Sequence, residues 1–492
     1  MNKLKRYLAL DFGAESGRAI AAHFDGHRIE LEILHRFSTD STNMLGTLFW
    51  DFPGFIRNVK LGLTAYSAKY GPELGGIACD SWGVDFGLLD NTGHLLGNPV
   101  HYRDKRTKGM TEKLHAIIPA RTLYQRTGIQ ILEINTIYQL YYLVLSNSPL
   151  LDKAVSMLLL ADLVSYMLTG IPVQEYTLAT TSEMYDVKKG DWSSDSLLSA
   201  KIPPGIMPDI IAPGTVVGPI LDSVAIECGL ASTPIIAAGS HDTASAVAAV
   251  PAVGDDWLYI SSGTWSLMGA ELNSPIINDA TFAKNFTNEG GVDGTIRFLK
   301  NITGMWILEE CRRTWAKEGE KLDYATITRL GEQAAPLQRV INPTDIRYQA
   351  PGEMPSRINQ ALKESKQLPA REKGEFIRLI LDSLALCYRY TGETLEELTG
   401  RKYNVIHIVG GGSQNTLLNQ LTADATGKVV KAGPVEATAL GNSLMQAMAL
   451  GDIGSLAEGR EVIRNSVEVT TYQPSGNSER WNDAYQRFLK LL

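Results

Sequence analysis

Apolar residues occur along the chain in short blocks, and many of these blocks end at glycine, serine or aspartate. Residues 7–10 form an apolar run just before Asp11, which predicts a short buried strand. Residues 18–24 and 28–37 resume the strand pattern, and the Asp-Gly pair at 25–26 between them is typical of a hairpin turn. The chain is therefore predicted to open with three strands.

The same order of elements returns about halfway along the 492 residues. Residues 257–260 predict a strand, residues 261–264 a turn of small residues, and residues 265–270 a return strand. This repetition predicts a duplicated α/β unit, although chance recurrence of a hairpin explains it nearly as well.

Longer apolar periods predict helices between these strands. In residues 55–70 the apolar positions Ile56, Val59, Leu63 and Tyr66 share one face. The other expected helices span residues 158–168, 243–250, 306–315, 376–398 and 436–450, and further strands are expected at 75–79, 84–89, 234–238 and 405–409. Residues 251–256 mark the expected boundary between a first domain, 1–250, and a second, 251–492.

Length and charge narrow the class of protein. A chain of 492 residues exceeds the roughly 250–300 residues at which single cores stop growing, so two domains are expected. Its 46 basic and 54 acidic residues leave a net charge of −8, without the basic surface of a nucleic-acid-binding protein. The four cysteines lack metal-site spacing, and the sequence has no apolar stretch long enough for a membrane helix. We expect a soluble, cytoplasmic protein with buried thiols.

The 45 glycines gather at predicted strand ends, where α/β sheets bind ligands. Asp11 ends the first strand and a turn containing Gly13 and Gly17 follows. Such a turn can present backbone N–H groups to phosphate, and Asp11 can hold a hydrated Mg²⁺. The turn is neither a Walker loop nor a dinucleotide-binding loop. The alternative is a plain hairpin with a solvated aspartate.

A second strand-end aspartate, Asp242, follows the predicted strand at 234–238. Here Asp242 can accept a hydroxyl proton as a general base while His241 and Thr243 hold neighbouring hydroxyls. A simple helix N-cap explains this aspartate about as well. The small residues at 244–249 predict that the helix packs closely against another element.

Two further turns are suited to phosphate. Residues 261–264 offer hydroxyls and backbone N–H groups, and residues 410–412 are three consecutive glycines before a predicted helix. Two strand-end aspartates together with these turns favour phosphoryl transfer, which needs a base, a metal site and phosphate-binding loops. Aromatic, acidic and basic residues at 80–85 and 101–106 are typical of binding sites for polyhydroxylated ligands, although a buried strand edge and a solvated loop are simpler readings.

Nine motifs spread in order over nearly the whole chain resemble the FGGY family of carbohydrate kinases, within the actin-like ATPase superfamily. They lie at residues 11–18, 80–86, 102–104, 240–247, 261–269, 287–291, 299–302, 407–415 and 432–437. The resemblance implies an α/β fold of two actin-like (ribonuclease H-like) domains, each a mixed sheet flanked by helices. It also implies a cleft between the domains, which we expect to close over sugar and ATP.

The resemblance further implies ATP- and Mg²⁺-dependent transfer of the γ-phosphoryl group to the 1-hydroxyl of L-rhamnulose, as in L-rhamnose catabolism, with Asp242 as the base. The implied sugar contacts are Gly83, His241, Asp242, Thr243 and Asn301. The implied ATP contacts are Ala14, Glu15, Ser16, Gly17, Arg18, Thr264 and Gly411. Two residues depart from the expected pattern: Glu309 stands where related kinases have a glutamine that contacts ATP, and Glu15 places a negative charge in the first phosphate turn.

Three alternatives remain open from the sequence. The substrate could be another deoxy-ketose such as L-fuculose, or a sugar taken by a xylulokinase-like enzyme. The chain could also be a non-catalytic sugar sensor on the same fold, although a sensor need not keep both a base and phosphate-binding turns. An actin-like or chaperone ATPase would not need the aromatic surroundings of Trp82 and Tyr102.

Overall fold

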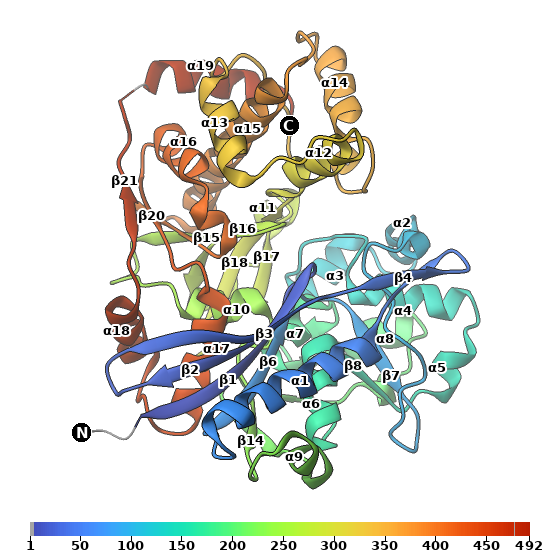
Figure 1. Cartoon of the computed structure of the whole chain (residues 1–492). Coiled ribbons are helices and arrows are strands. Elements are labelled where there is room, and N and C mark those ends of the chain that lie inside the picture. The colour runs from blue at the N-terminus through green and yellow to red at the C-terminus, as the bar shows by residue number, and fades with distance from the viewer. Residues whose placement is uncertain (1–3, 477) are drawn as a thin grey trace. The chain divides into compact units, whose positions relative to one another are not determined.

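The computed structural model describes residues 4–476 and 478–492, which fold into two compact units (Figure 1). Among the described residues, the first unit contains 4–251, 271–298 and 437–466. The second unit contains residues 252–270, 299–436 and 467–492.

The first unit is built on a six-stranded sheet in the order β13-β14-β6-β1-β2-β3. β1 pairs antiparallel with β2 and parallel with β6, and β14 pairs parallel with β6. The carboxyl ends of β1, β6 and β14 therefore meet at one edge. The strands are β1 (Lys5–Phe12), β2 (Ser16–Phe24), β3 (Ile29–Ser38), β6 (Gly76–Ser81), β13 (Thr215–Pro219) and β14 (Pro234–Ala237).

Most of a seven-stranded sheet, in the order β17-β18-β16-β15-β19-β20-β21, belongs to the second unit. β15 pairs antiparallel with β16 and parallel with β19, while β20 pairs parallel with β19 and antiparallel with β21. The strands are β15 (Trp257–Ser262), β16 (Ser266–Leu272), β17 (Thr287–Gly290), β18 (Ile296–Ile302), β19 (Val405–Val409), β20 (Val429–Ala432) and β21 (Thr470–Tyr472).

The two sheets repeat the same arrangement. In both, a hairpin opens the unit, its first strand pairs parallel with a later strand, and an antiparallel pair closes the far edge. This confirms the duplicated α/β unit predicted from the recurring hairpin.

Helices of the first unit cover its sheet. α1 (Phe52–Tyr70) begins after Asp51, whose side chain accepts a hydrogen bond from the backbone N–H of Gly54. Val59, Leu63 and Tyr66 of the predicted face are buried, whereas Ile56 is only partly buried and Phe55 is buried in addition. In Figure 1, α1 runs across the blue strands, and the red-orange α17 (Ala437–Ala449) lies beside β1 although it comes from the other end of the chain.

The close packing predicted for the small residues after Asp242 is confirmed. α10 (Asp242–Ala248) packs against α17, and a Cβ added at Gly441 would lie 1.7 Å from the carbonyl oxygen of Ser245. The two helix backbones therefore approach so closely that only glycine fits at this contact. Because α17 packs on α10, β1 and β6, it belongs to the first unit, as does α18 (Leu456–Ser466). The structure thus differs from a single division after residue 250.

The predicted start of one helix is wrong. Residues 158–168 were expected to be a single buried helix, but β8 (Ser156–Leu159) precedes α6 (Leu160–Thr169). β8 pairs antiparallel with β7 (Phe86–Leu89), which places Met157 opposite Leu88. A four-residue apolar run has no period by which the sequence could separate a strand from a helix.

The remaining elements complete the two units. Those of the first unit are β4 (Ser41–Met44), β5 (Thr47–Trp50), η1 (Lys105–Thr107), α2 (Met110–His115), α3 (Ala120–Thr127), α4 (Thr136–Leu145), α5 (Pro149–Lys153), β9 (Val173–Glu175), α7 (Tyr176–Thr181), β10 (Tyr185–Asp186), β11 (Asp191–Trp192), α8 (Ser194–Ser199), η2 (Pro204–Ile206), β12 (Asp209–Ile211), α9 (Asp222–Cys228) and α11 (Asp279–Ala283). Those of the second are α12 (Trp306–Lys317), α13 (Tyr324–Gln333), η3 (Ile346–Tyr348), α14 (Met354–Glu364), α15 (Lys373–Thr399), η4 (Gly411–Gln414), α16 (Thr416–Thr426) and α19 (Ser478–Leu489).

Two expectations about the whole chain can be compared with the structure. All four cysteines are buried and unpaired, as expected. Across residues 4–476 and 478–492, none of the helices has the length and apolar character needed to cross a membrane.

Candidate active site

Three aspartates lie at or beyond the carboxyl ends of strands that meet at one edge of the first unit's sheet. In the strand register Asp11 of β1 lies opposite Asp80 of β6, and Ser81 forms a bridge with His241, next to Asp242. Burial raises the pKa of Asp80 well above its usual range, and the negative charges of Asp11 and Asp242 raise it further. The edge therefore brings the carboxyl groups of Asp11, Asp80 and Asp242 close together.

Asp11 and Asp80 have different partners. The guanidinium of Arg18 donates to Asp11 at 2.5 Å, and Asp11 is only 3% exposed. Asp80 accepts a hydrogen bond of 2.7 Å from the side-chain amide of Asn442, whereas its other oxygen is buried with no hydrogen-bond partner among the described residues. From the sequence, Asp80 was noted only within the run at 80–85 and not as a strand-end aspartate like Asp11.

Asp242 is the first residue of α10, and His241 occupies the N-cap position without a side-chain cap bond. The simpler reading of Asp242 as an N-cap is therefore wrong. Its Oδ1 accepts the backbone N–H of Thr243 at 2.6 Å and the hydroxyl of Thr243 at 3.2 Å. Burial is the main cause that raises the pKa of Asp242, and 30% of its side chain remains exposed. Within the described part of the chain, Oδ2 has no donor and is available to a ligand.

A buried carboxyl group holds the loop before Asp242. Glu175 Oε2 accepts the backbone N–H of Ser240 at 3.2 Å and the hydroxyl of Thr177 at 2.6 Å. The backbone N–H of His241 in turn donates to Thr177 Oγ1 at 3.1 Å. Burial raises the pKa of Glu175 to about 7, and burial followed by the charge of Glu175 raises that of Asp162. This network fixes the backbone that carries His241 and Asp242.

Aromatic side chains surround the loop at Gly83. The indole N–H groups of Trp50 and Trp82 both donate to Asp85 Oδ2, at 2.6 and 2.8 Å, and burial raises the pKa of Asp85 to about 6. The ring of His101 stacks on Trp50 with 4.0 Å between centroids. Trp82 is thus buried, as its simpler reading suggested, and its N–H is bound by Asp85. A Cβ at Gly83 would lie 2.8 Å from the hydroxyl of Thr181, so packing also favours glycine there.

The turn between β1 and β2, which was predicted to bind phosphate, is short. The backbone N–H of Gly13 bonds to the carbonyl of Ser16 at 3.0 Å, which places Ala14 and Glu15 at the tip, with Glu15 exposed. A Cβ at Gly17 would lie 2.2 Å from the ring of Phe37, so this glycine is needed for packing whatever it binds.

In the second unit, one of the turns predicted to bind phosphate has open space beside its backbone, unlike the turn at Gly17. A Cβ at Gly411 would meet no atom within 4 Å, whereas one at Gly412 would lie 1.9 Å from the hydroxyl of Ser262. Gly410 has φ of 83°, in the region that favours glycine. In the β15–β16 turn the carbonyl of Thr264 accepts the backbone N–H of Trp306 at 3.1 Å. Gly411 is therefore the position where a ligand can approach the backbone without displacing a side chain.

The last two predicted contacts lie elsewhere in the second unit. Asn301 is half-buried in β18. Both carboxylate oxygens of Glu309 accept from Arg312, at 2.9 and 2.7 Å, and the hydroxyl of Tyr324 donates to one of them at 3.1 Å. Glu309 is thus held in an ion pair on α12. Arg312 balances the negative charge that Glu309 has and the expected glutamine would not have.

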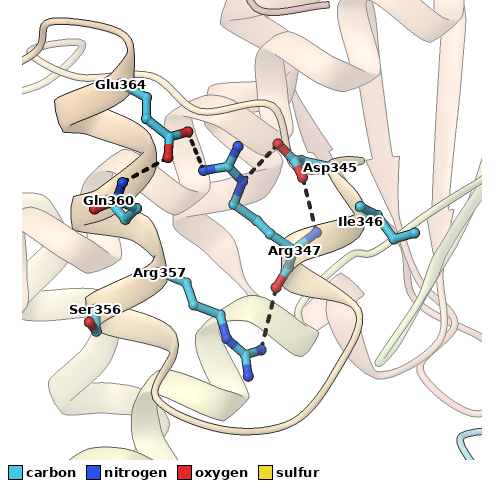
Figure 2. Close-up of a pocket in the computed structure, with 7 residues that line it drawn as sticks. All are labelled: Asp345, Ile346, Arg347, Ser356, Arg357, Gln360 and Glu364. Carbon is cyan, nitrogen blue, oxygen red and sulfur yellow. Dashed lines mark hydrogen bonds and ion pairs between the residues drawn. The ribbon is translucent and has the colours of Figure 1, made fainter. Parts of the chain in front are cut away.

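A pocket of about 500 Å³ in the second unit contains none of the predicted site residues (Figure 2). Arg347 spans it, bonding to Asp345 at 2.8 Å and to Glu364 at 2.7 Å. The charge of Arg347 is thus balanced by two carboxylates that line the same pocket.

Comparisons with known proteins identify the family of the chain. Residues 6–249 match the N-terminal domain of the FGGY family of carbohydrate kinases, and residues 258–450 match its C-terminal domain. The chain is 39% identical over 484 residues to a rhamnulokinase of Bacteroides thetaiotaomicron, covering 98% of this chain and 99% of that protein. It is 38% identical over 489 residues to a rhamnulokinase of Enterococcus faecalis, covering 99% and 98%.

Solved structures show the same fold at lower identity. A ligand-bound xylulose kinase from Lactobacillus acidophilus superposes with a TM-score of 0.82 at 17% identity, covering 99% of this chain and 97% of that one. A Plasmodium falciparum glycerol kinase with ADP gives a TM-score of 0.78 at 14% identity, covering 100% and 98%. On the family matches to both halves and the identity to full-length relatives, the chain belongs to the FGGY family of carbohydrate kinases.

Proposed function

We propose that this carbohydrate kinase transfers the γ-phosphoryl group of ATP to the 1-hydroxyl of L-rhamnulose. The observation that carries the proposal is the identity of 39% and 38% to two proteins named rhamnulokinase, over 98% and 99% of this chain. The site supports it with a carboxylate at Asp242 that is held through one oxygen and open at the other.

In the proposed reaction Asp242 acts as the general base. Its Oδ2 accepts the proton of the sugar's 1-hydroxyl, and the oxygen of that hydroxyl forms a bond to the γ-phosphorus. The bond between the γ-phosphorus and the β–γ bridging oxygen breaks, which releases ADP. The raised pKa of Asp242 makes it a stronger proton acceptor than an exposed aspartate. We assign Gly83, His241, Thr243 and Asn301 to the sugar's other groups.

For the nucleotide, we assign the first phosphate turn (residues 14–18) together with Thr264 and Gly411. Backbone N–H groups of such turns bind phosphate oxygens without needing positive side chains. Glu309 carries its own counter-charge in Arg312, so we expect its carboxylate not to repel the nucleotide.

Mg²⁺ fits the acidic edge of the first unit. Mg²⁺ is usually bound by one or two carboxylates, waters and substrate phosphates rather than by a complete protein cage, so the lack of a cluster of three ligands among the described residues is no obstacle. Asp80 Oδ1 is buried and has no hydrogen-bond partner among the described residues, so this edge has a carboxyl oxygen that a cation or its bound water would satisfy. We assign Asp11 to the metal, which when bound would neutralise phosphate charge.

The test is ADP release in a coupled assay with L-rhamnulose, L-fuculose, D-xylulose and glycerol. We expect the highest kcat/KM with L-rhamnulose. A higher value with L-fuculose or D-xylulose would replace the proposed substrate by that sugar, because a few polar contacts decide between such sugars. Sugar binding by calorimetry without ADP release would support a sensor instead.

We also place the reaction in the cytoplasm, where four free thiols would stay reduced.

A further inference from the structure

Charged groups face both nitrogens of the His241 ring. The guanidinium of Arg297 lies 2.9 Å from Nδ1, and Glu289 Oε2 lies 3.4 Å from the same nitrogen. On the other side, Nε2 lies 3.4 Å from Asp242 Oδ1. The ring is only 9% exposed, so these neighbours and not solvent decide where its protons lie.

Arg297 is fixed in place. Its side chain is fully buried, its Nε donates to the carbonyl of Gly290 at 2.8 Å, and its Nη1 lies 3.3 Å from Glu289 Oε2. A buried guanidinium needs such partners, and together they leave Nη2 directed at His241. Nothing in the sequence marked this residue, because it lies in β18 between the motifs at 287–291 and 299–302 and belongs to neither.

The chemistry of the pair determines the proton's position. A guanidinium has only donors, so the 2.9 Å contact requires that Nδ1 of His241 accept. A neutral imidazole that accepts at Nδ1 carries its hydrogen on Nε2, which faces Asp242.

We infer that Arg297 is a positioning residue that fixes His241 as its neutral Nε2–H tautomer, so that the ring presents a donor to Asp242 Oδ1. The N–H faces Oδ1 at 3.4 Å, beside the two donors from Thr243, and Oδ2 is left to take the substrate's proton. The consequence for turnover rests on the proposed function, whereas the tautomer does not.

Glu289 allows the inference to be tested, because its carboxylate and the guanidinium of Arg297 both lie near Nδ1 of His241. Without Arg297, the carboxylate of Glu289 would accept from Nδ1, and the hydrogen would leave the Nε2 side. A lone pair on Nε2 would then face the carboxylate of Asp242 and push it from its position. A glutamine at 289 could instead donate to Nδ1 and return the hydrogen to Nε2.

The experiment is nitrogen NMR on full-length protein labelled at its eight histidines, with the His241 signals assigned by their loss in His241→Asn. We expect the Nε2–H tautomer in the wild type, the Nδ1–H tautomer in Arg297→Met, and the Nε2–H tautomer again in the double variant Arg297→Met/Glu289→Gln. Arg378→Met serves as a matched control, since it breaks a buried arginine–aspartate pair in the second unit. It should leave the His241 signals unchanged.

Turnover should follow the tautomer. We expect kcat to fall by about 10–100-fold in Arg297→Met with a smaller change in sugar KM, and to recover at least about threefold in the double variant. The Nδ1–H tautomer in the wild type would overturn the inference even if Arg297→Met does not fold. So would a double variant no more active than the single one. If no sugar is phosphorylated, the proposed function fails while the NMR result still decides the tautomer.

Discussion

The two sheets share one strand order but carry opposite chemistry at corresponding edges. In the first unit, Asp11 ends β1 and Asp80 lies beside it on β6, and both are buried carboxylates. In the second unit, Ser262 ends β15 and the glycines 410–412 follow β19, so that edge is neutral and small. A repeated backbone therefore accommodates an acidic site in one copy and a neutral, phosphate-compatible turn in the other.

Under the proposed function, this difference divides the phosphoryl transfer between the two units. A base needs a carboxylate whose pKa is raised, which burial and neighbouring charges provide in the first unit. A phosphate group needs backbone N–H groups and no negative side chain, which the second unit's turns provide. The acidic edge has a cost, because every buried carboxylate with a raised pKa lowers the stability of the fold once it ionises.

The largest expected effect removes the base from the acidic edge. Asp242→Asn keeps the size of the side chain and an oxygen for Thr243 but cannot accept the proton. We expect kcat to fall by about 10²–10⁴-fold with sugar affinity nearly unchanged, measured by ADP release and calorimetry. Unchanged turnover would remove Asp242 from the role of base.

The next prediction concerns the cost of burying Glu175. Its pKa is raised from 4.5 to about 7 by burial, so the folded state binds this proton more tightly than the unfolded state. The unfolding free energy should therefore fall as the pH rises from about 4.5 to about 7, by about 1.4 kcal/mol for each pH unit between these two values.

Denaturant unfolding of wild type and Glu175→Gln across this pH range measures the effect. The fall in unfolding free energy should be smaller in the variant. The other buried carboxyl groups with raised pKa values, among them Asp85, Asp162 and Glu183, should cause the fall that remains. Parallel stability curves for the two proteins would show that Glu175 does not ionise in this range.

A smaller effect is expected at the neutral edge. Gly411→Ala meets no neighbouring atom and should leave the melting temperature unchanged, but its methyl group would stand where the proposed phosphate approaches. We expect the KM for ATP to rise about tenfold, equal to about 1.4 kcal/mol, with little change in the sugar KM. Gly412→Ala is the contrasting variant, because its clash with Ser262 should lower the melting temperature as well. An unchanged ATP KM in Gly411→Ala would exclude this turn from nucleotide binding.

The smallest effect is expected at Glu15, the charged tip of the first phosphate turn. The side chain is exposed, so solvent screens its charge from a bound phosphate. Glu15→Gln should change the KM for ATP by less than about threefold, measured at low salt. A larger decrease would mean that the side chain lies against the phosphates.

Much of the sheet architecture could be predicted from the sequence, because each hairpin is local. The strands on either side of Gly13 and Gly263 have apolar runs and turn residues that mark their ends. The return of α17 to the first unit could not be predicted, since it depends on the fit of Gly441 against α10 and not on any local pattern. The sequence also could not distinguish β8 from the helix that follows it.

The site shows the same limit. Asp11 and Asp242 stand at strand ends and were found by that signal, and Asp80 could have been found in the same way. Glu175 and Arg297 act through loops and side chains distant in the sequence, so only the folded structure brings them to residues 240–242. The sequence likewise cannot show that the space beside Gly411 is open whereas Gly17 packs against Phe37.

The division between the two edges is tested most directly by titration calorimetry of L-rhamnulose and of ADP into Asp242→Asn and Gly411→Ala. The account predicts that Asp242→Asn binds both ligands within about threefold of wild type although it does not turn over, and that Gly411→Ala loses about tenfold in ADP affinity alone. Equal losses of sugar and ADP affinity in Gly411→Ala, or wild-type affinity for both, would contradict it.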